Sequence, residues 1–169
     1  MSTTPDTSPS PRDLLREQLA TVMPHTLVTL PDDLPELIRT ADVIVHADAL
    51  PEVVPFVIDQ LGYGLLSDIA AVDYVEHGLF ELVYRFYSIG GGGDLVIKVR
   101  VPREQPDVPS LLPILPGARL HEREAYDLFG IRFIGHPDLR RIYMWDEFEG
   151  FPMRKDFPKQ GDNYIGEGA

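Results

Sequence analysis

The sequence predicts an α+β fold: a two-layer α/β sandwich with a mixed sheet, in the order helix, two strands, helix, three strands, followed by a long irregular C-terminal extension. Three observations support this prediction. Apolar residues recur at helical spacing in some segments, they alternate with polar residues in others, and both patterns stop after Gly130. Because 44% of the 169 residues are hydrophobic, the chain can bury a substantial core.

The N-terminal part predicts a disordered start, one helix and two strands. Residues 1–10 are small, polar and proline-bearing, so we expect them to be disordered. A helix begins at Pro11, which suits a first helical turn, and ends at Pro24. Residues 25–30 and 42–47 are short β-branched runs, and we expect both to form strands.

The middle of the chain predicts one helix and three strands. Residues 51–61 are apolar at helical spacing, with proline in the first turn and glycine after the end. Strands are expected at 65–75, 79–89 and 94–101. The glycines at 90–93 lead into a strand, whereas a phosphate-binding loop leads into a helix, so a hairpin loop is predicted here.

One more helix, over residues 117–129, completes an α/β domain expected to span residues 11–130. The remaining residues, 131–169, hold seven of the 16 aromatic residues but lack a regular period. We expect few contacts within the chain to offset the cost of ordering this backbone, about 1–2 kcal/mol per residue. We therefore predict an extended partner-binding segment. The alternative is that it folds back over the open face of the sheet.

Composition excludes several classes of site. The chain has no cysteine, so it cannot form a disulfide, a zinc–thiolate site or a cysteine-ligated iron–sulfur cluster. Its net charge of −12 argues against nucleic-acid binding. We expect a soluble chain, because the N-terminus lacks the pattern of a secretory signal and no apolar run reaches the roughly 20 residues that span a bilayer.

The predicted helix at 117–129 concentrates titratable residues. Glu124 and Asp127 are three residues apart and share a helix face, as an acid–base pair would. The same spacing also allows ion pairs with Arg123 and other neighbouring arginines. Ion pairing is the more common arrangement on a charged helix.

The histidines and basic pairs predict neither a metal site nor a lipid site. The five histidines lack metal-binding spacing, and His136, within Gly-His-Pro, is expected to form hydrogen bonds in a turn. The basic pairs are Arg140 with Arg141 and Arg154 with Lys155. They fall short of the roughly 4–8 clustered charges typical of anionic lipid recognition, so we expect contact with a protein partner.

An ordered series of motifs resembles a known family. Residues 122–130 (EREAYDLFG), Phe133 and residues 135–142 (GHPDLRRI) are followed by residues 148–158 (FEGFPMRKDFP). This order of motifs resembles that of the complex I 30 kDa subunit family. In bacteria, complex I is the NADH–quinone oxidoreductase. The resemblance covers roughly residues 12–160.

The resemblance implies a structural and assembly subunit in the hydrophilic arm of a proton-translocating complex. The implied location is peripheral, on the cytoplasmic face of the cell membrane, with membrane contact only through the complex. The implied partners are the 49 kDa-like quinone-site subunit and the iron–sulfur subunits, and these partners would carry the FMN and the clusters.

The resemblance also implies that the matching positions are interface or turn-fixing residues, and that none is catalytic or binds a cofactor or metal. These positions are Glu122, Arg123, Glu124, Asp127, His136, Asp138, Arg140, Arg141, Trp145, Arg154, Lys155 and Asp156. Two alternatives are open. One is the equivalent component of an energy-converting hydrogenase or of a ferredoxin- or deazaflavin-dependent complex. The other is a free-standing hydrolase that uses the carboxylates of the charged helix.

Overall fold

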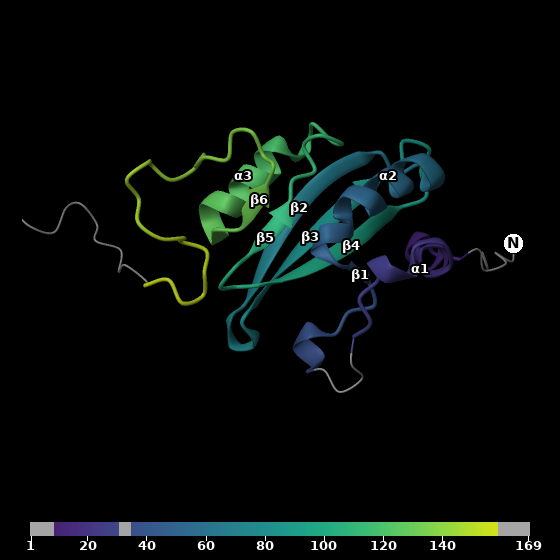
Figure 1. The fold of residues 1–169 in the computed structure, drawn as a ribbon, viewed down its shortest axis with the longest axis horizontal. Coiled ribbons are helices and arrows are strands. Elements are labelled where there is room, and N and C mark those ends of the chain that lie inside the picture. Colours follow the sequence, from purple (N-terminus) through teal and green to yellow (C-terminus); the bar gives the residue numbers. More distant parts are fainter. Residues whose placement is uncertain (1–8, 31–34, 159–169) are drawn as a thin grey trace, which may run out of the picture.

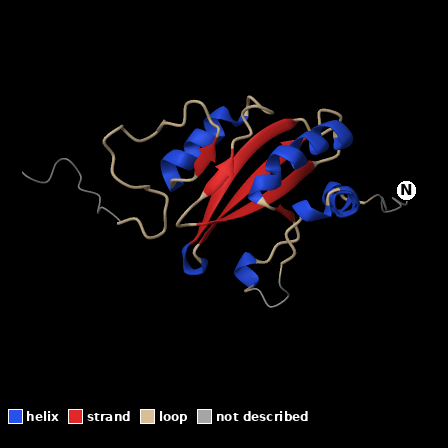
Figure 2. Cartoon of the chain, viewed as in Figure 1, coloured by secondary structure: helices blue, strands red, loops and turns tan. Residues whose placement is uncertain are grey.

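A computed structural model describes residues 9–30 and 35–158 as an α+β fold with a mixed sheet (Figures 1 and 2). The α-helices are α1 (Pro11–Val22), α2 (Leu50–Leu61) and α3 (Ala118–Phe129). The strands are β1 (Val43–Val45), β2 (Leu65–Tyr74), β3 (Leu79–Tyr87), β4 (Asp94–Pro102), β5 (Asp107–Pro109) and β6 (Arg132–Ile134). Short 3₁₀ turns lie at Pro24–Thr26, Glu36–Ile38, Ala47–Ala49 and Val75–His77.

The main sheet has four strands in the order β1-β4-β3-β2. β1 runs parallel to β4, and the other neighbours are antiparallel, which confirms the predicted mixed sheet. Alternate residues of β3, from Phe80 through Leu82 and Tyr84 to Phe86, are fully buried and share a core with the apolar residues of all three helices. The helices therefore cover one face of the sheet, and Figure 1 shows α2 lying across it.

The prediction of disorder over residues 1–10 is wrong for Ser10, the residue before α1. Residues 1–8 lie outside the described residues, but Ser10 is ordered and caps the helix. Its hydroxyl oxygen accepts a hydrogen bond from the backbone N–H of Asp13 at 3.2 Å, which satisfies a donor that the first helical turn leaves unpaired.

The predicted strand at residues 25–30 is wrong. Its first residues form a 3₁₀ turn after Pro24, and only a single β-bridge, from Leu27 to Val45, follows. β1 is only three residues long, so it offers few backbone groups to a neighbour.

Among the described residues, no helix is both long and apolar enough to cross a bilayer.

A second, two-stranded sheet was not predicted. β5 and β6 run parallel, and the Arg132 guanidinium forms two hydrogen bonds of 2.6 Å with the Asp107 carboxylate. Ile131 and Phe133 are buried in the main core. Residues 131–134 therefore belong to the folded domain and not to the extension in which the sequence placed them.

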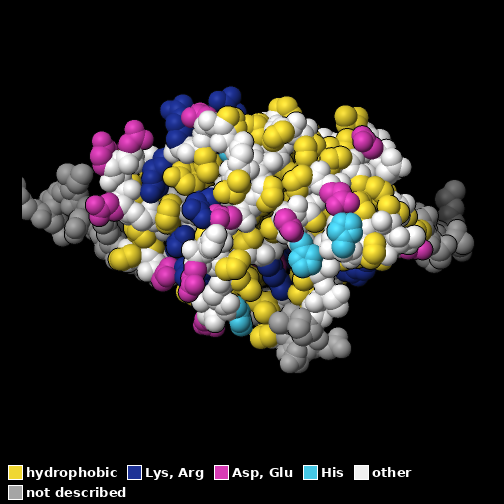
Figure 3. Space-filling view, viewed as in Figure 1, with side chains coloured by type: hydrophobic (Ala, Val, Ile, Leu, Met, Phe, Trp, Pro, Cys, Tyr) yellow, Lys and Arg dark blue, Asp and Glu magenta, His cyan; other side chains and the backbone are white. Residues whose placement is uncertain are grey.

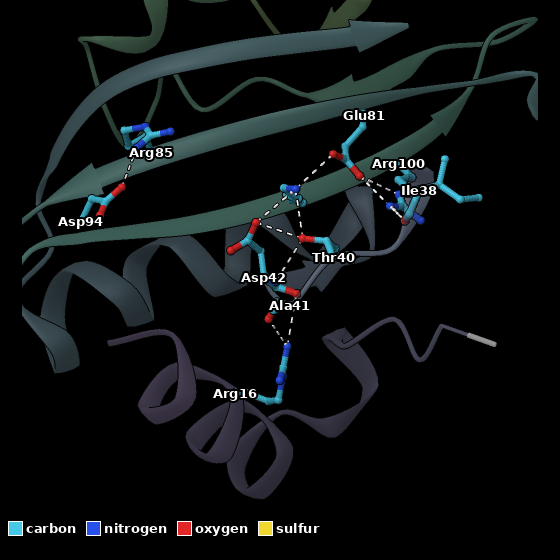
Figure 4. Close-up of polar contacts among 10 residues, drawn as sticks. Arg16, Ile38, Thr40, Ala41, Asp42, Glu81, Arg85, Asp94 and Arg100 are labelled. Atoms are coloured by element: carbon cyan, nitrogen blue, oxygen red, sulfur yellow. Dashed lines mark hydrogen bonds and ion pairs between the residues drawn. The ribbon is translucent and has the colours of Figure 1, made fainter. Parts of the chain in front are cut away.

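A charged network lies on the sheet face opposite the helices (Figure 4). Glu81, only 2% exposed, pairs with Lys98 at 3.3 Å and with Arg100 at 2.7 Å. Lys98 also pairs with Asp42 at 3.1 Å, and Arg100 donates a hydrogen bond to the carbonyl of Ile38. These contacts hold the chain before β1 across one edge of this face.

We expect Glu81→Gln to lower the free energy of unfolding by about 3–5 kcal/mol, because it leaves two largely buried cations without their shared carboxylate. Urea unfolding followed by circular dichroism measures the change. The matched control is Asp94→Asn, which removes the exposed ion pair between Asp94 and Arg85 on the same face. That change should cost at most about 1 kcal/mol. Equal losses in the two variants would contradict the role assigned to Glu81.

Candidate subunit-interface site

The C-terminal segment, defined here as residues 135–158, lies beside α3 and the adjoining end of the sheet (Figure 1). It contacts α3, Asp73 and Phe80. Asp73 and Phe80 are paired across β2 and β3, and Phe80 belongs to the sheet face that the helices cover. The expectation of few contacts within the chain is therefore wrong for these residues. The open-face alternative is also wrong for residues 135–158, because this described part of the tail packs on the opposite face, whereas residues 159–169 lie outside the described residues.

Asp127 on α3 is the main anchor of the C-terminal segment. Its fully buried carboxylate accepts hydrogen bonds from three successive backbone N–H groups, those of Ile142 at 2.9 Å, Tyr143 at 2.6 Å and Met144 at 3.0 Å. The Arg141 guanidinium pairs with the other carboxylate oxygen at 2.7 Å. One side chain thus fixes four consecutive residues of the segment.

The surroundings of Asp127 favour its charged form. Burial alone would raise the pKa of this carboxyl, but the three backbone N–H groups and the Arg141 guanidinium together outweigh burial. The pKa of Asp127 is therefore lowered from its ordinary value. A carboxylate held as an anion by four donors is suited to binding a backbone, and it is poorly suited to taking up a proton as a general base near neutral pH.

Two arginines reinforce this anchor. Arg123 on α3 donates hydrogen bonds of 3.1 Å to the carbonyl oxygens of Arg140 and Arg141. Arg141 donates to the carbonyl of Gly150 at 2.8 Å, and its guanidinium lies over the ring of Phe148 at 5.6 Å. The side chain of Arg141 therefore links residue 141 of the segment to residue 150.

Glu122 has a separate role on the other side of α3. It is fully buried and accepts hydrogen bonds of 2.6 Å from the hydroxyl of Ser110 and from the N–H of Leu111. Burial raises the pKa of Glu122, and these two hydrogen bonds offset only part of that effect. Burial, and then the charge of Glu122, also raise the pKa of the Tyr84 phenol. Glu122 thus ties α3 to the loop that precedes it.

The carboxylates of α3 are therefore engaged separately. Glu124, the other member of the acid–base pair considered from sequence, is half-buried and accepts a 3.3 Å hydrogen bond from the hydroxyl of Tyr143. Asp127 is bound to the C-terminal segment, as described above. The predicted ion pairs with Arg123 and its neighbouring arginines are therefore not formed: Asp127 pairs with Arg141, and Glu124 accepts a hydrogen bond from Tyr143.

His136 and Asp138 organise the turn after β6. The Nδ1 atom of His136 accepts a hydrogen bond from the N–H of Asp138 at 3.1 Å, and its Nε2 atom lies 3.4 Å from the carbonyl of Arg119. The Asp138 carboxylate pairs with Arg140 at 3.0 Å and with Arg119 at 3.6 Å. Within the described residues, no group of three or more His, Asp or Glu side chains could hold a metal ion.

A second anchor joins the far end of the segment to the sheet. Arg103, just after β4, pairs with Asp73 of β2 at 2.8 Å and with Asp156 at 2.7 Å. The backbone N–H of Lys155 donates to Asp73 at 2.9 Å. Asp73 and Arg103 were not predicted as site residues, because the chain separates them from Lys155 and Asp156 by more than fifty residues.

Arg154 and Gly130 complete this second anchor. Arg154 donates to the carbonyl of Phe129 at 2.7 Å, and its guanidinium lies over the rings of Phe80 and Phe151. Gly130, at the end of α3, has a φ of +76°, and a Cβ atom there would lie 2.5 Å from the Phe151 ring. Glycine is therefore required for both the backbone turn and the close packing of the segment.

We expect Asp127→Asn to loosen the C-terminal segment, because the amide loses the negative charge and turns an N–H group towards existing donors. With about 1.5–3 kcal/mol for each hydrogen bond to a charged group, amides 142–144 should exchange with deuterium roughly a hundredfold faster. Hydrogen-exchange mass spectrometry of peptides covering this region measures the change. Glu124→Gln is the control and should leave the exchange within about threefold. Unchanged exchange in Asp127→Asn would refute the anchor.

The same comparison predicts a pH dependence. Because the pKa of Asp127 is lowered by folding, its contribution to stability is fully present above its unfolded value of about 3.9, and it is lost as the pH falls through the folded value. The ratio of exchange rates between Asp127→Asn and the unmodified chain should stay constant from about pH 7 to 5 and decline below about pH 4. A ratio that grew on acidification would have the wrong sign.

Comparison with known proteins identifies the family. Residues 43–163 match the model of the respiratory-chain NADH dehydrogenase 30 Kd subunit. The corresponding NADH-quinone oxidoreductase subunit of Moorella thermoacetica is 44% identical over 117 residues, which cover 69% of this chain and 79% of that protein. That of a Roseiflexus species is 39% identical over 82% of this chain and 83% of its own length. That of Rhizobium etli is 54% identical, but the match covers only 53% of it.

Solved structures share the fold. The trypsin-resistant fragment (1–134) of Nqo5 is 34% identical, with a TM-score of 0.51, over 57% of this chain and 80% of that chain. A chain in the archaeal membrane-bound sulfane sulfur reductase is 25% identical, with a TM-score of 0.69, over 86% of this chain and 85% of that chain. These matches, together with the shared motifs, show that the chain belongs to the 30 kDa subunit family of respiratory-chain NADH dehydrogenases.

Proposed function

We propose that the chain is a non-catalytic structural and assembly subunit of a proton-translocating NADH–quinone oxidoreductase. In this proposal it belongs to the hydrophilic arm, beside the 49 kDa-like quinone-site subunit and the iron–sulfur subunits. Those partners carry the FMN and the clusters that pass electrons from NADH to quinone. The chain is peripheral on the cytoplasmic face of the membrane, and its contact with the membrane is through the complex.

The engagement of the α3 carboxylates is the observation that carries the non-catalytic part of this proposal. Glu122 and Asp127 are fully buried, and each binds backbone N–H groups of its own chain. A catalytic acid or base must reach the proton that it transfers in a bound substrate. These two buried carboxylates therefore support a structural role. Asp127, one member of the acid–base pair considered from sequence, is bound within its own chain, which counts against the hydrolase alternative.

The C-terminal segment supports the proposed role in assembly. Its two anchors order the backbone before any partner binds, which lowers the entropy cost of association.

The related-complex alternative keeps one specific observation in its favour. The match to a chain of the sulfane sulfur reductase covers more of this chain than the match to Nqo5 does. The same architecture therefore suits a structural component of another respiratory membrane complex. The two proposals differ in the identity of the electron-donor module and agree on the role of this chain.

Purification of the tagged chain from its host in mild detergent tests the proposal. We expect the NADH-binding flavoprotein, the iron–sulfur subunits and the quinone-site subunit to co-purify and to be identified by mass spectrometry. Deletion of the gene should abolish NADH–quinone reductase activity in the membranes, and Glu124→Gln should restore it as fully as the unmodified gene.

The other outcomes separate the alternatives. Recovery with a hydrogenase or sulfur-reductase module would reassign the complex while keeping the structural role. Recovery as a lone protein, with a soluble activity that Glu124→Gln abolishes, would overturn the proposal and favour the hydrolase.

A further inference from the structure

The two anchors leave part of the C-terminal segment projecting from the molecule. We call residues 144–150 (MWDEFEG) the acidic loop. The N–H of Phe148 donates to the carbonyl of Trp145 at 3.0 Å, and Gly150 returns the chain with a φ of +88°. At one end of the loop the N–H of Met144 donates to Asp127 at 3.0 Å, and at the other end Arg141 donates to the carbonyl of Gly150 at 2.8 Å. The loop is thus ordered by the chain itself, although it projects.

Trp145, the single tryptophan of the chain, is 63% exposed on this loop. Its ring packs edge-to-face with Phe148 at 4.9 Å between centroids, and Phe148 stacks on Phe157 at 5.8 Å. The indole is therefore held by contact with Phe148, while most of its surface is exposed to solvent. Tryptophan held in this way resembles the anchor residues that contribute most of the binding energy in protein interfaces.

Three carboxylates follow Trp145 within the acidic loop. Asp146, Glu147 and Glu149 are exposed, and within the part of the chain that the structure describes they form no ion pair or side-chain hydrogen bond. Figure 3 shows acidic side chains gathered at the end of the molecule where the segment loops out in Figure 1. Negative charge that is not compensated within the chain, next to an apolar anchor, favours a partner surface with positive charge.

We propose that Trp145 and the acidic loop form a docking surface for a protein subunit that presents an apolar pocket edged by lysine and arginine. This proposal rests on the proposed function, since the partner is another subunit of the same complex. An anionic lipid surface and a nucleic acid are disfavoured, because either would bring its negative charge against the three carboxylates. The carboxylates would steer association, and the indole would fill the pocket.

The test uses the full chain, tagged and assembled in its host. Trp145→Ala should lower the yield of co-purified complex subunits roughly thirtyfold, the loss expected of an interface anchor. The combined variant Asp146→Lys, Glu147→Lys and Glu149→Lys should lower it at least tenfold at low salt, and less at high salt because ions screen the repulsion. Hydrogen exchange of amides 142–144 should stay unchanged, which shows that the segment is still docked.

Matched controls are available elsewhere on the surface. Ile89→Ala removes another exposed apolar side chain, one that is 96% exposed. The combined variant Glu17→Lys, Glu36→Lys and Asp59→Lys makes the same change in net charge at exposed positions of α1, of the 3₁₀ turn before β1 and of α2. Both controls should assemble like the unmodified chain. Equal losses in the controls and in the loop variants would overturn the proposal.

Carbodiimide cross-linking identifies the occupant. We expect amide links between carboxylates of the acidic loop and lysines of a partner subunit in the purified complex. Links only between two copies of this chain, or binding of the complex-free chain to anionic vesicles that Trp145→Ala abolishes, would overturn the proposal. If the unmodified chain assembles and the loop variants assemble equally, the docking surface is wrong and the proposed function stands. If the unmodified chain does not assemble, the proposed function fails first.

Discussion

The organisation of this protein beyond its sheet depends on one buried carboxylate. Asp127 receives three successive backbone N–H groups and an arginine, so it fixes the chain where neither helix nor strand could do so. A buried carboxylate is costly to desolvate unless several donors compensate it. Here the donors come from the irregular segment. The segment therefore compensates the buried charge, and the buried charge in turn orders the segment.

Helix α3 binds both the loop before it and the segment after it, because it carries two buried carboxylates whose pKa values are shifted in opposite directions. Glu122 binds the loop that precedes the helix, and burial raises its pKa. Asp127 binds the segment that follows, and its four donors lower its pKa. A cluster of charged residues that resembles catalytic machinery in the sequence is thus divided between two structural tasks.

The same anchors prepare the surface that remains exposed. Arg141 and Arg154 lie over aromatic rings while their N–H groups bind backbone carbonyls, so they pin the segment at both of its ends. Trp145 is left open between these fixed points. Ordering the backbone within the subunit reduces what a partner must contribute on binding. In a multi-subunit enzyme, a preordered segment of this kind suits a component whose task is to hold neighbours in place.

Hydrophobic patterns, together with the prolines and glycines that bound them, predicted the three α-helices, strands β2 to β4 and the hairpin between β3 and β4, because each of these signals is local. The motifs at 122–130, 135–142 and 148–158 likewise indicated the family. Tertiary structure decided the rest. It reduced residues 25–30 to one bridge, paired β5 with β6, and brought Asp73 to the N–H of Lys155, 82 residues away. Such contacts join groups that no local period relates, so they depend on how the folded chain places their partners within hydrogen-bonding distance.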